Sequence, residues 1–254
     1  MISRHEAVLN GIALSSVSPL IYITDISYPA PSIQTSVYTV AKRHGGRIRR
    51  RYIDKNSVVI SMMIRAYDVR QRQEICNAVG KWAKAGGILE TRDRVGQRLR
   101  CVCDSFPTVT SALRWTDPVT VTLSAYEQPF WEELYPSKLT LTGTSESGVL
   151  HVPGNADEAL IEVKITAGAS LSSITMTAGS KSMTLSGLSI ASGGVITISY
   201  DDEMIQSIKT GSTSLLSKRT GADDLLAECG GNTNISISAS ASVTAEFSAR
   251  GLWI

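Results

Sequence analysis

The sequence predicts a mainly β protein built from two domains, residues 1–133 and 134–254. Apolar and polar residues alternate through much of both halves, which is typical of half-buried strands. The net charge also changes between the halves. Residues 1–133 contain 18 Lys and Arg against 12 Asp and Glu, a net of +6, whereas residues 134–254 contain 7 against 11, a net of −4. This change occurs across a Pro-bounded aromatic segment, Pro129–Pro136, and therefore favours two separately folded domains.

In the first half, the alternation predicts an antiparallel sheet. Its strongest strands are Val58–Ile64 and Val119–Ala125, where apolar residues occupy every second position. Shorter strands are predicted at 20–26, 88–91, 98–104 and 108–115.

A single helix is predicted between these strands. Asp68 can act as its N-cap, and Gln71 follows three positions later at the capping-box spacing. The apolar face of the helix is expected to contain Ile75, Ala78, Val79 and Trp82. Gly86 and Gly87 follow where a left-handed residue is needed to end a helix. Because strands and helices do not alternate, the pattern favours a mostly antiparallel sheet with one helix over a parallel doubly wound sheet.

The second half predicts a β-sandwich. Its alternating segments are Leu139–Leu141, Ile161–Ile165, Ile174–Ala178, Ile196–Tyr200 and Ile235–Phe247. Gly- and Asn-rich turns are expected at 153–155, 193–194 and 230–232. Strict alternation with Ile and Val distinguishes this Ser/Thr-rich half from a low-complexity linker, so several strands without a helix indicate a sandwich.

No pattern in the sequence points to catalysis, a cofactor or a bound metal ion. His5, His44 and His151 are scattered, and none has a second ligand at metal-binding spacing. The GSKS segment at 179–182 lacks the spacing of a phosphate-binding loop and is expected to be a hairpin turn. No apolar run approaches the roughly 20 residues that a membrane-spanning helix needs. We therefore predict a protein that is not an enzyme, holds no cofactor or metal, and does not act at a membrane.

The densest charge lies in the segment KRHGGRIRRR between two predicted strands. Its six cations are Lys42, Arg43, Arg47, Arg49, Arg50 and Arg51. The two glycines favour a protruding loop or hairpin, and guanidinium groups pair readily with carboxylates of a neighbouring protein. We therefore expect these residues to contact an adjacent subunit or another protein. A solvated loop and contact with a nucleic-acid backbone are the alternatives.

Taken in order, several motifs of this chain resemble the distal tail protein of siphophages. They are the HGG loop at 44–46, VVISMMIRAY at 58–67, the helix at 68–84, ILETRDRVGQRLRCVCDSF at 88–106, VTVTLSAYEQPFWEE at 119–133, the Gly154-Asn155 turn followed by LIEVKI, and the final GLWI. The resemblance covers nearly the whole chain and is one of order and spacing.

The resemblance implies a structural protein of the phage tail tip. It implies a ring-forming N-terminal domain with a split-barrel-like antiparallel sheet and one helix, followed by a galectin-like β-sandwich. Six copies are expected to form a ring between the tail tube protein and the baseplate hub protein. Genomic DNA is expected to pass through the lumen without specific binding. The protein is expected in the virion after assembly in the host cytoplasm.

Two further expectations concern aromatic residues. Pro129, Phe130 and Trp131 lie at the predicted domain junction and are expected to form a packed interdomain hinge. The main alternative function is a carbohydrate-binding or host-adhesion module, which would use the second domain. Such a module usually needs exposed aromatic side chains. The candidates in that half are Tyr135, Tyr200, Phe247 and Trp253.

Overall fold

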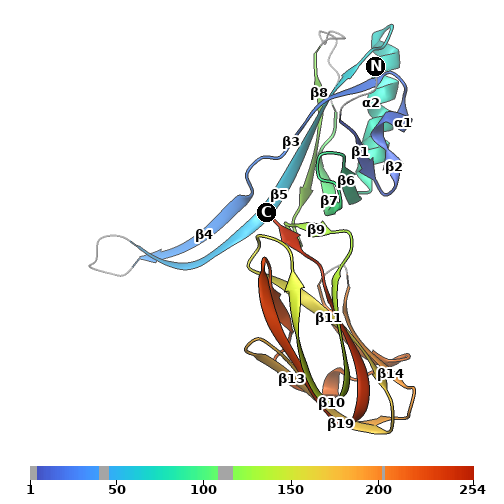
Figure 1. Cartoon of the computed structure of the whole chain (residues 1–254). Helices are drawn as coiled ribbons and strands as arrows, with labels where there is room; N and C mark the ends of the chain where they lie inside the picture. The colour runs from blue at the N-terminus through green and yellow to red at the C-terminus, as the bar shows by residue number, and fades with distance from the viewer. Residues whose placement is uncertain (1–4, 40–45, 108–116, 202–203) are drawn as a thin grey trace. The chain divides into compact units, whose positions relative to one another are not determined.

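The chain folds into two mainly β units. The computed structural model describes residues 5–39, 46–107, 117–201 and 204–254. Its contacts divide the chain into Met1–Trp131 with Ile254, here unit 1, and Glu132–Trp253, here unit 2. Strands predominate in both units (Figure 1), so the predicted fold class is confirmed. The predicted roles of a ring-forming domain at 1–133 and a galectin-like sandwich at 134–254 stay predictions.

Unit 1 is built on an antiparallel sheet with the strand order β2-β1-β6-β7-β8-β5-β3. These strands are β1 (Ala7–Leu9), β2 (Ile12–Ala13), β3 (Ile21–Ser27), β5 (Gly46–Ile64), β6 (Gly87–Thr91), β7 (Gln97–Ser105) and β8 (Val119–Ala125). Alternation had predicted β3, β6, β7, β8 and the second half of β5. The predicted strand at 108–115 lies outside the described residues. The short strands β1 and β2 were not predicted, because two or three residues are too few to show a period.

The predicted helix is α2 (Val69–Lys84), and its start and end follow the predicted signals. Asp68 Oδ1 accepts a hydrogen bond from Gln71 N at 2.7 Å, and Gln71 Oε1 accepts one from Tyr67 N at 2.8 Å. Gly86 follows the helix in the left-handed region, with φ of +61°. Many helices end with such a residue, and glycine adopts this conformation without steric cost.

The buried face of α2 is rotated slightly from the predicted one. Its buried residues are Arg72, Ile75, Cys76, Val79 and Ala83. Trp82, which the prediction placed on this face, is only half-buried, and its indole Nε1 donates to Ile12 O at 2.9 Å. The indole N–H needs an acceptor, and the backbone of β2 supplies one at the rim of the core. A second helix, α1 (Leu14–Val17), has only four residues.

β5 is the longest strand of unit 1 and changes partners along its 19 residues. Residues Asn56–Met62 pair with β8 and residues Val59–Ile64 pair with β3, at the centre of the sheet. Residues Gly46–Lys55 pair instead with β4 (Ser32–Thr39). The resulting two-stranded ribbon extends away from the sheet of unit 1 (Figure 1). We call β4 together with Gly46–Lys55 of β5 the arm.

Ten described strands of unit 2 form one continuous hydrogen-bonded antiparallel set. These strands are β10 (Ser137–Val152), β11 (Glu158–Ala167), β12 (Leu171–Ala178), β13 (Lys181–Ile190), β14 (Val195–Tyr200), β15 (Gln206–Thr210), β16 (Thr213–Ser214), β17 (Arg219–Gly221), β18 (Leu226–Glu228) and β19 (Gly231–Ala249). The two halves of this set, which meet along β10 and β19, are here called the two sheets of unit 2. The remaining short elements of unit 2 are η1 (Leu216–Lys218) and β20 (Leu252–Trp253). The short strand β9 (Trp131–Glu133) begins with Trp131, which belongs to unit 1.

The two longest strands of unit 2 run through both sheets. β10 follows β19 along nearly its whole length, with a register shift between Gly143 and Ser145. On its other side β19 pairs first with β12, up to Ala239, and then with β11, from Val243. The β10–β19 pair therefore joins a sheet containing β12 and β13 to one containing β11 and β14. The inward alternate residues, such as Phe247, are fully buried and form the core.

Candidate interaction surface on the arm

The arm presents two faces of different chemistry. Directly opposite residues of an antiparallel pair lie on the same face. One face therefore contains the pairs Ile33–Ile53, Thr35–Arg51 and Val37–Ile48. The other contains Gln34–Tyr52 and Ser36–Arg50. The register shift between Ser36 and Val37 leaves Arg49 without a directly opposite residue. An apolar stripe interrupted by one arginine thus lies along one face of the arm.

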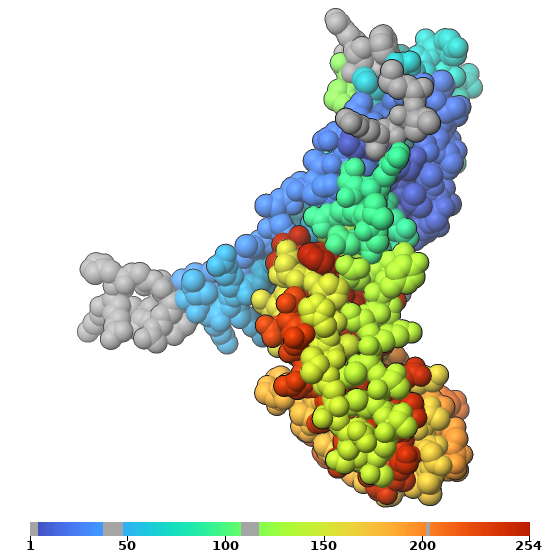
Figure 2. Space-filling model, viewed as in Figure 1, coloured from blue at the N-terminus to red at the C-terminus, as the bar shows by residue number. Residues whose placement is uncertain are grey.

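This apolar stripe is open to solvent. Ile33, Val37 and Ile48 are 50%, 55% and 64% exposed. In the space-filling view, the described part of the arm protrudes from the sheet of unit 1 as light blue atoms (Figure 2). Isolated exposed apolar residues are common on protein surfaces, but several on one face of a thin ribbon are typical of a contact surface.

Four of the six basic residues predicted for an interface, Arg47, Arg49, Arg50 and Arg51, lie in β5 of this arm. Arg49, Arg50 and Arg51 are exposed residues of β5. Arg47 is also in β5, but its side chain is outside the description, and Lys42 and Arg43 lie outside the described residues. Of the described arginines, Arg51 therefore lies within the apolar stripe, Arg50 lies on the opposite face, and Arg49 lies at the register shift. Whether they contact another subunit stays a prediction.

Sequence reasoning missed the apolar part of this surface. The segment SIQTSVYT forms β4, with Ile33 and Val37 as its alternating apolar residues. Polar residues fill most other positions, so the period-2 signal is weak there. The pairing partner of β4 is also not encoded in any local pattern, and it is this pairing that brings Ile48 beside Val37.

The arm has few contacts that could stabilise it alone. Among the described residues, no third strand pairs with β4 or with Gly46–Lys55, so both edges of the ribbon keep free backbone groups. A two-stranded ribbon is marginally stable in water, and open edges favour pairing with other chains. Exposed apolar, cationic and backbone groups together can bind another protein surface.

The predicted hinge residues are packed inside unit 1. Trp131 is fully buried, and its ring contacts Tyr28 edge-on at 5.8 Å between centroids. The guanidinium of Arg94 lies 4.9 Å from the centroid of the Trp131 ring and 5.1 Å from that of Tyr28. Burial lowers the pKa of Arg94 and raises that of Tyr28. Pro129 is also buried and Phe130 half-buried, and their role as a hinge stays a prediction.

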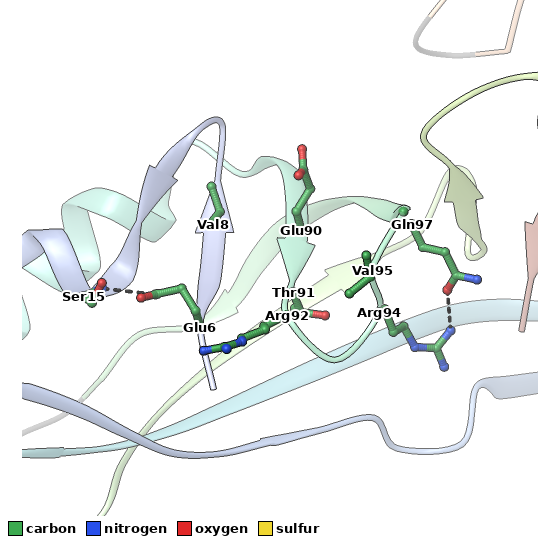
Figure 3. A pocket seen from close by; sticks show the side chains of 10 residues that line it. Glu6, Val8, Ser15, Glu90, Thr91, Arg92, Arg94, Val95 and Gln97 are labelled. Carbon is green, nitrogen blue, oxygen red and sulfur yellow. Dashed lines mark hydrogen bonds between the residues drawn. The ribbon is translucent and has the colours of Figure 1, made fainter. Parts of the chain in front are cut away.

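An open cleft of about 640 Å³ lies on unit 1 between β1, β6 and the turn that follows β6 (Figure 3). Two of its charged side chains, Glu6 and Arg94, make local contacts. Glu6 Oε1 accepts from the backbone N of Ala7 at 3.1 Å and of Ser15 at 3.3 Å. Arg94 donates to Gln97 Oε1 at 3.4 Å. Ser15 contacts Glu6 through its backbone N and not through its hydroxyl, so this pair is not arranged as a nucleophile and its base.

The other sequence candidates for chemistry have structural roles where they are described. His5 Nδ1 is 3.3 Å from Asp93 Oδ2, and His151 Nδ1 is 3.1 Å from Asn232 Oδ1. GSKS forms the predicted hairpin turn, since Ala178 pairs with Lys181 between β12 and β13. Within the described ranges, no group of three or more His, Cys, Asp or Glu side chains could hold a metal ion. None of the described helices is long and apolar enough to cross a membrane.

The aromatic residues of unit 2 do not form a platform for sugar binding. Phe247 is fully buried in the core. Trp253 is half-buried, and its Nε1 donates to Glu133 Oε1 at 3.0 Å. Tyr200 is also half-buried, with its hydroxyl accepting from Gln206 Nε2 at 3.2 Å. Of these candidates only Tyr135 is well exposed, at 79%. A single aromatic side chain does not favour a carbohydrate-binding surface.

The fold resembles that of a known phage protein. A scan against family models and a search of curated proteins found no match. Among solved structures, the crystal structure of the SPP1 Dit (gp 19.1) protein matches with a TM-score of 0.70 and 14% sequence identity, covering 97% of this chain and 98% of that one. This chain has the fold of SPP1 Dit. The resemblance to distal tail proteins, predicted from the order of sequence motifs, is thus confirmed at the level of fold.

Two further matches come from the baseplate of phage P2. In the activated conformation with Ca, the matching chain gives a TM-score of 0.48 and 9% identity, covering 99% of this chain and 98% of that one. In the activated conformation with Sr, the values are 0.45 and 9%, covering 97% of both chains. The SPP1 Dit structure, described as a paradigm of the hub adsorption apparatus in phages that infect Gram-positive hosts, is the more similar of these matches.

Proposed function

We propose that this protein is a structural component of a phage tail tip. In the proposed assembly, six copies form a ring that joins the tail tube protein to the baseplate hub protein and leaves a lumen for DNA. The proposed location is the virion, reached after assembly in the host cytoplasm. The near-full-length similarity of fold to SPP1 Dit supports this proposal. The observation that carries it is the arm, whose exposed apolar side chains and unpaired strand edges favour contact with another protein surface.

The chemistry of the arm favours a different surface of a neighbouring copy as its partner. Two arms carry the same positive charges at Arg49, Arg50 and Arg51, so two arms facing each other would repel. Contact between unlike surfaces of identical subunits is heterologous, and a heterologous contact closes into a ring when its rotation is an integral fraction of a turn. A two-fold contact of arm against arm is therefore disfavoured, and a heterologous ring contact, in which the arm meets another surface of the next copy, fits the charge of the arm.

The arm arginines provide a direct test. In a variant with Arg49, Arg50 and Arg51 changed to Gln, we expect the monomer to stay folded, because these side chains are exposed. Self-association should weaken roughly tenfold or more, since a few charge pairs at an interface are lost. Sedimentation velocity across salt concentrations measures this change. The wild-type protein should dissociate more readily as salt rises, and the variant should show a flatter salt dependence.

A control variant removes the same number of positive charges from a surface outside the arm. Arg70, Lys81 and Lys84 are exposed on α2, and changing all three to Gln also removes three positive charges. Association of this control should stay near that of the wild-type protein. If both variants weakened association equally, overall charge and not the arm would be responsible.

A further inference from the structure

A carboxylate lies beside the point where β5 leaves the sheet of unit 1. Up to Lys55, β5 pairs with β4, and from Asn56 onward it pairs with β8. Asp104 on β7 reaches this point with both oxygens hydrogen-bonded. Its Oδ2 accepts from Lys55 Nζ at 3.0 Å and Ser124 Oγ at 2.7 Å. Its Oδ1 accepts from Tyr126 Oη at 2.8 Å. One side chain thus connects the root of the arm to two strands of the sheet.

A second hydrogen bond extends this connection along β5. The hydroxyls of Ser124 and Ser57 are 2.8 Å apart. Because Ser124 uses its only hydroxyl proton toward Asp104, Ser57 is the donor in this pair. Ser57 and Lys55 lie on the same face of β5, two residues apart, on either side of the buried Asn56. Both are therefore linked to Asp104, one directly and one through Ser124.

The ammonium group of Lys55 also contacts an aromatic ring. Its Nζ lies 5.6 Å from the centroid of the Tyr126 ring, a cation–π distance. The side chains of Asp104 and Lys55 are only 23% and 35% exposed, so water screens this ion pair less than it screens a fully exposed one. Charge-assisted hydrogen bonds of this kind are shorter and stronger than neutral ones.

The backbone hydrogen bonds between strands define the direction of the arm relative to the sheet of unit 1 only weakly. Before Asn56, β5 has no described partner except β4, and a two-stranded ribbon twists and bends more easily than a wider sheet. The side-chain cluster of Lys55, Asp104, Ser124 and Tyr126 lies at the junction where such bending would occur.

We propose that Asp104 is a positioning residue for the arm. Through Lys55 it holds the arm in one direction relative to the sheet of unit 1 before any partner binds. The inference rests on the proposed function, because it concerns the surface that we propose joins neighbouring copies. A surface already held in its bound direction loses less conformational entropy on association, so the cluster strengthens assembly without contacting the partner.

Distance measurement on the full-length monomer tests this positioning. Spin labels at Ser36→Cys on β4 and Lys81→Cys on α2, in a Cys103→Ser background, report the direction of the arm by double electron–electron resonance. Both labelled positions are exposed. The parent protein should give a narrow distance distribution. In Asp104→Asn, the population of the held direction relative to others should fall roughly tenfold, the effect of losing one charge-assisted hydrogen bond, and the distribution should broaden.

Two further variants keep the result interpretable. Lys55→Met removes the link to the arm but leaves Asp104 bonded to Ser124 and Tyr126, so it should broaden the distribution even if Asp104→Asn unfolds. Asp25→Asn changes an exposed carboxylate on β3 of the same sheet and should leave the distribution narrow. A narrow distribution in Lys55→Met, or equal broadening in Asp25→Asn, would overturn the proposal.

The measurement separates this inference from the proposed function. If the distance distribution broadens in Lys55→Met but the wild-type protein never assembles, the result would support positioning by Asp104 and contradict the ring. Assembly of the wild-type protein with unchanged distances in Lys55→Met would support the ring and contradict the positioning role.

Discussion

At the scale of single residues, Asp104 is a carboxylate that accepts three side-chain hydrogen bonds. Partial burial raises the pKa of its carboxyl, but hydrogen bonds from Ser124, Tyr126 and Lys55 more than offset this effect, so the net pKa lies below the ordinary value of 3.8. The same contact raises the pKa of Lys55. The charged forms of both groups are therefore favoured in the folded protein.

This setting predicts a pH dependence of stability. A depressed pKa in the folded state contributes stability that is fully present above the unfolded-state pKa, near 3.8, and lost as the pH falls through the lower folded-state pKa. The wild-type protein should thus exceed Asp104→Asn in stability at pH 5–7. The difference should shrink below about pH 4, because the carboxylate of Asp104 becomes protonated there, whereas the amide of the variant does not titrate. Urea unfolding at several pH values measures it, and a constant difference down to pH 2 would argue against this origin.

At this scale, the capping residues of the helix gave an accurate prediction from the sequence. Asp68, Gln71 and Gly86 predicted the start and end of α2 because capping depends on neighbours within four residues. The Asp104 cluster could not be predicted in the same way. Its four members are up to 71 residues apart in the sequence, from Lys55 to Tyr126, and only the strand order of the sheet brings them together.

At the scale of elements, the arm is the feature that departs most from the sequence-based expectation. Alternation predicted Val58–Ile64, but β5 begins at Gly46 and is 19 residues long. The basic segment was expected to be a protruding loop or hairpin, and its described part, from Gly46, is a strand of the antiparallel β4–β5 ribbon, which agrees with the hairpin. Arginine is common on loops and on exposed strands alike, so the local pattern does not distinguish the two. The long strand of unit 2, β19, was predicted more fully because Ile235–Phe247 alternates strictly.

The two faces of the arm give a prediction at this scale. Replacing Ile33, Val37 and Ile48 by Ser removes exposed apolar area, so monomer stability should change by less than about 0.5 kcal/mol per residue. Self-association should weaken by roughly 1 kcal/mol per residue, because this area is buried only in the assembly. Sedimentation velocity and thermal unfolding of the same samples measure the two effects.

Tyr52→Ser is the control for this experiment. Tyr52 is 53% exposed but lies on the opposite face of the arm, paired with Gln34. Its replacement should affect association less than the triple change on the apolar stripe. A larger effect of Tyr52→Ser would mean that the other face of the arm contacts the partner.

At the scale of the whole molecule, each unit has its own core. In unit 1 the core is centred on β5 and β8, with Val58, Ile60 and Leu123 fully buried. In unit 2 it lies between the curled sheets, where Ile161 and Phe247 are fully buried. Composition and alternation predicted two mainly β halves because burial of alternate residues is a local property. They did not predict how β10 and β19 join the two sheets, since this depends on pairings between distant segments.

The most direct test of the central proposal is the size and shape of the purified full-length protein. Light scattering combined with negative-stain imaging at micromolar concentration measures both. A ring of six 27.3 kDa chains predicts a mass of about 164 kDa and images with a central hole. A monomer of 27.3 kDa that stays monomeric as its concentration is raised would contradict the proposal.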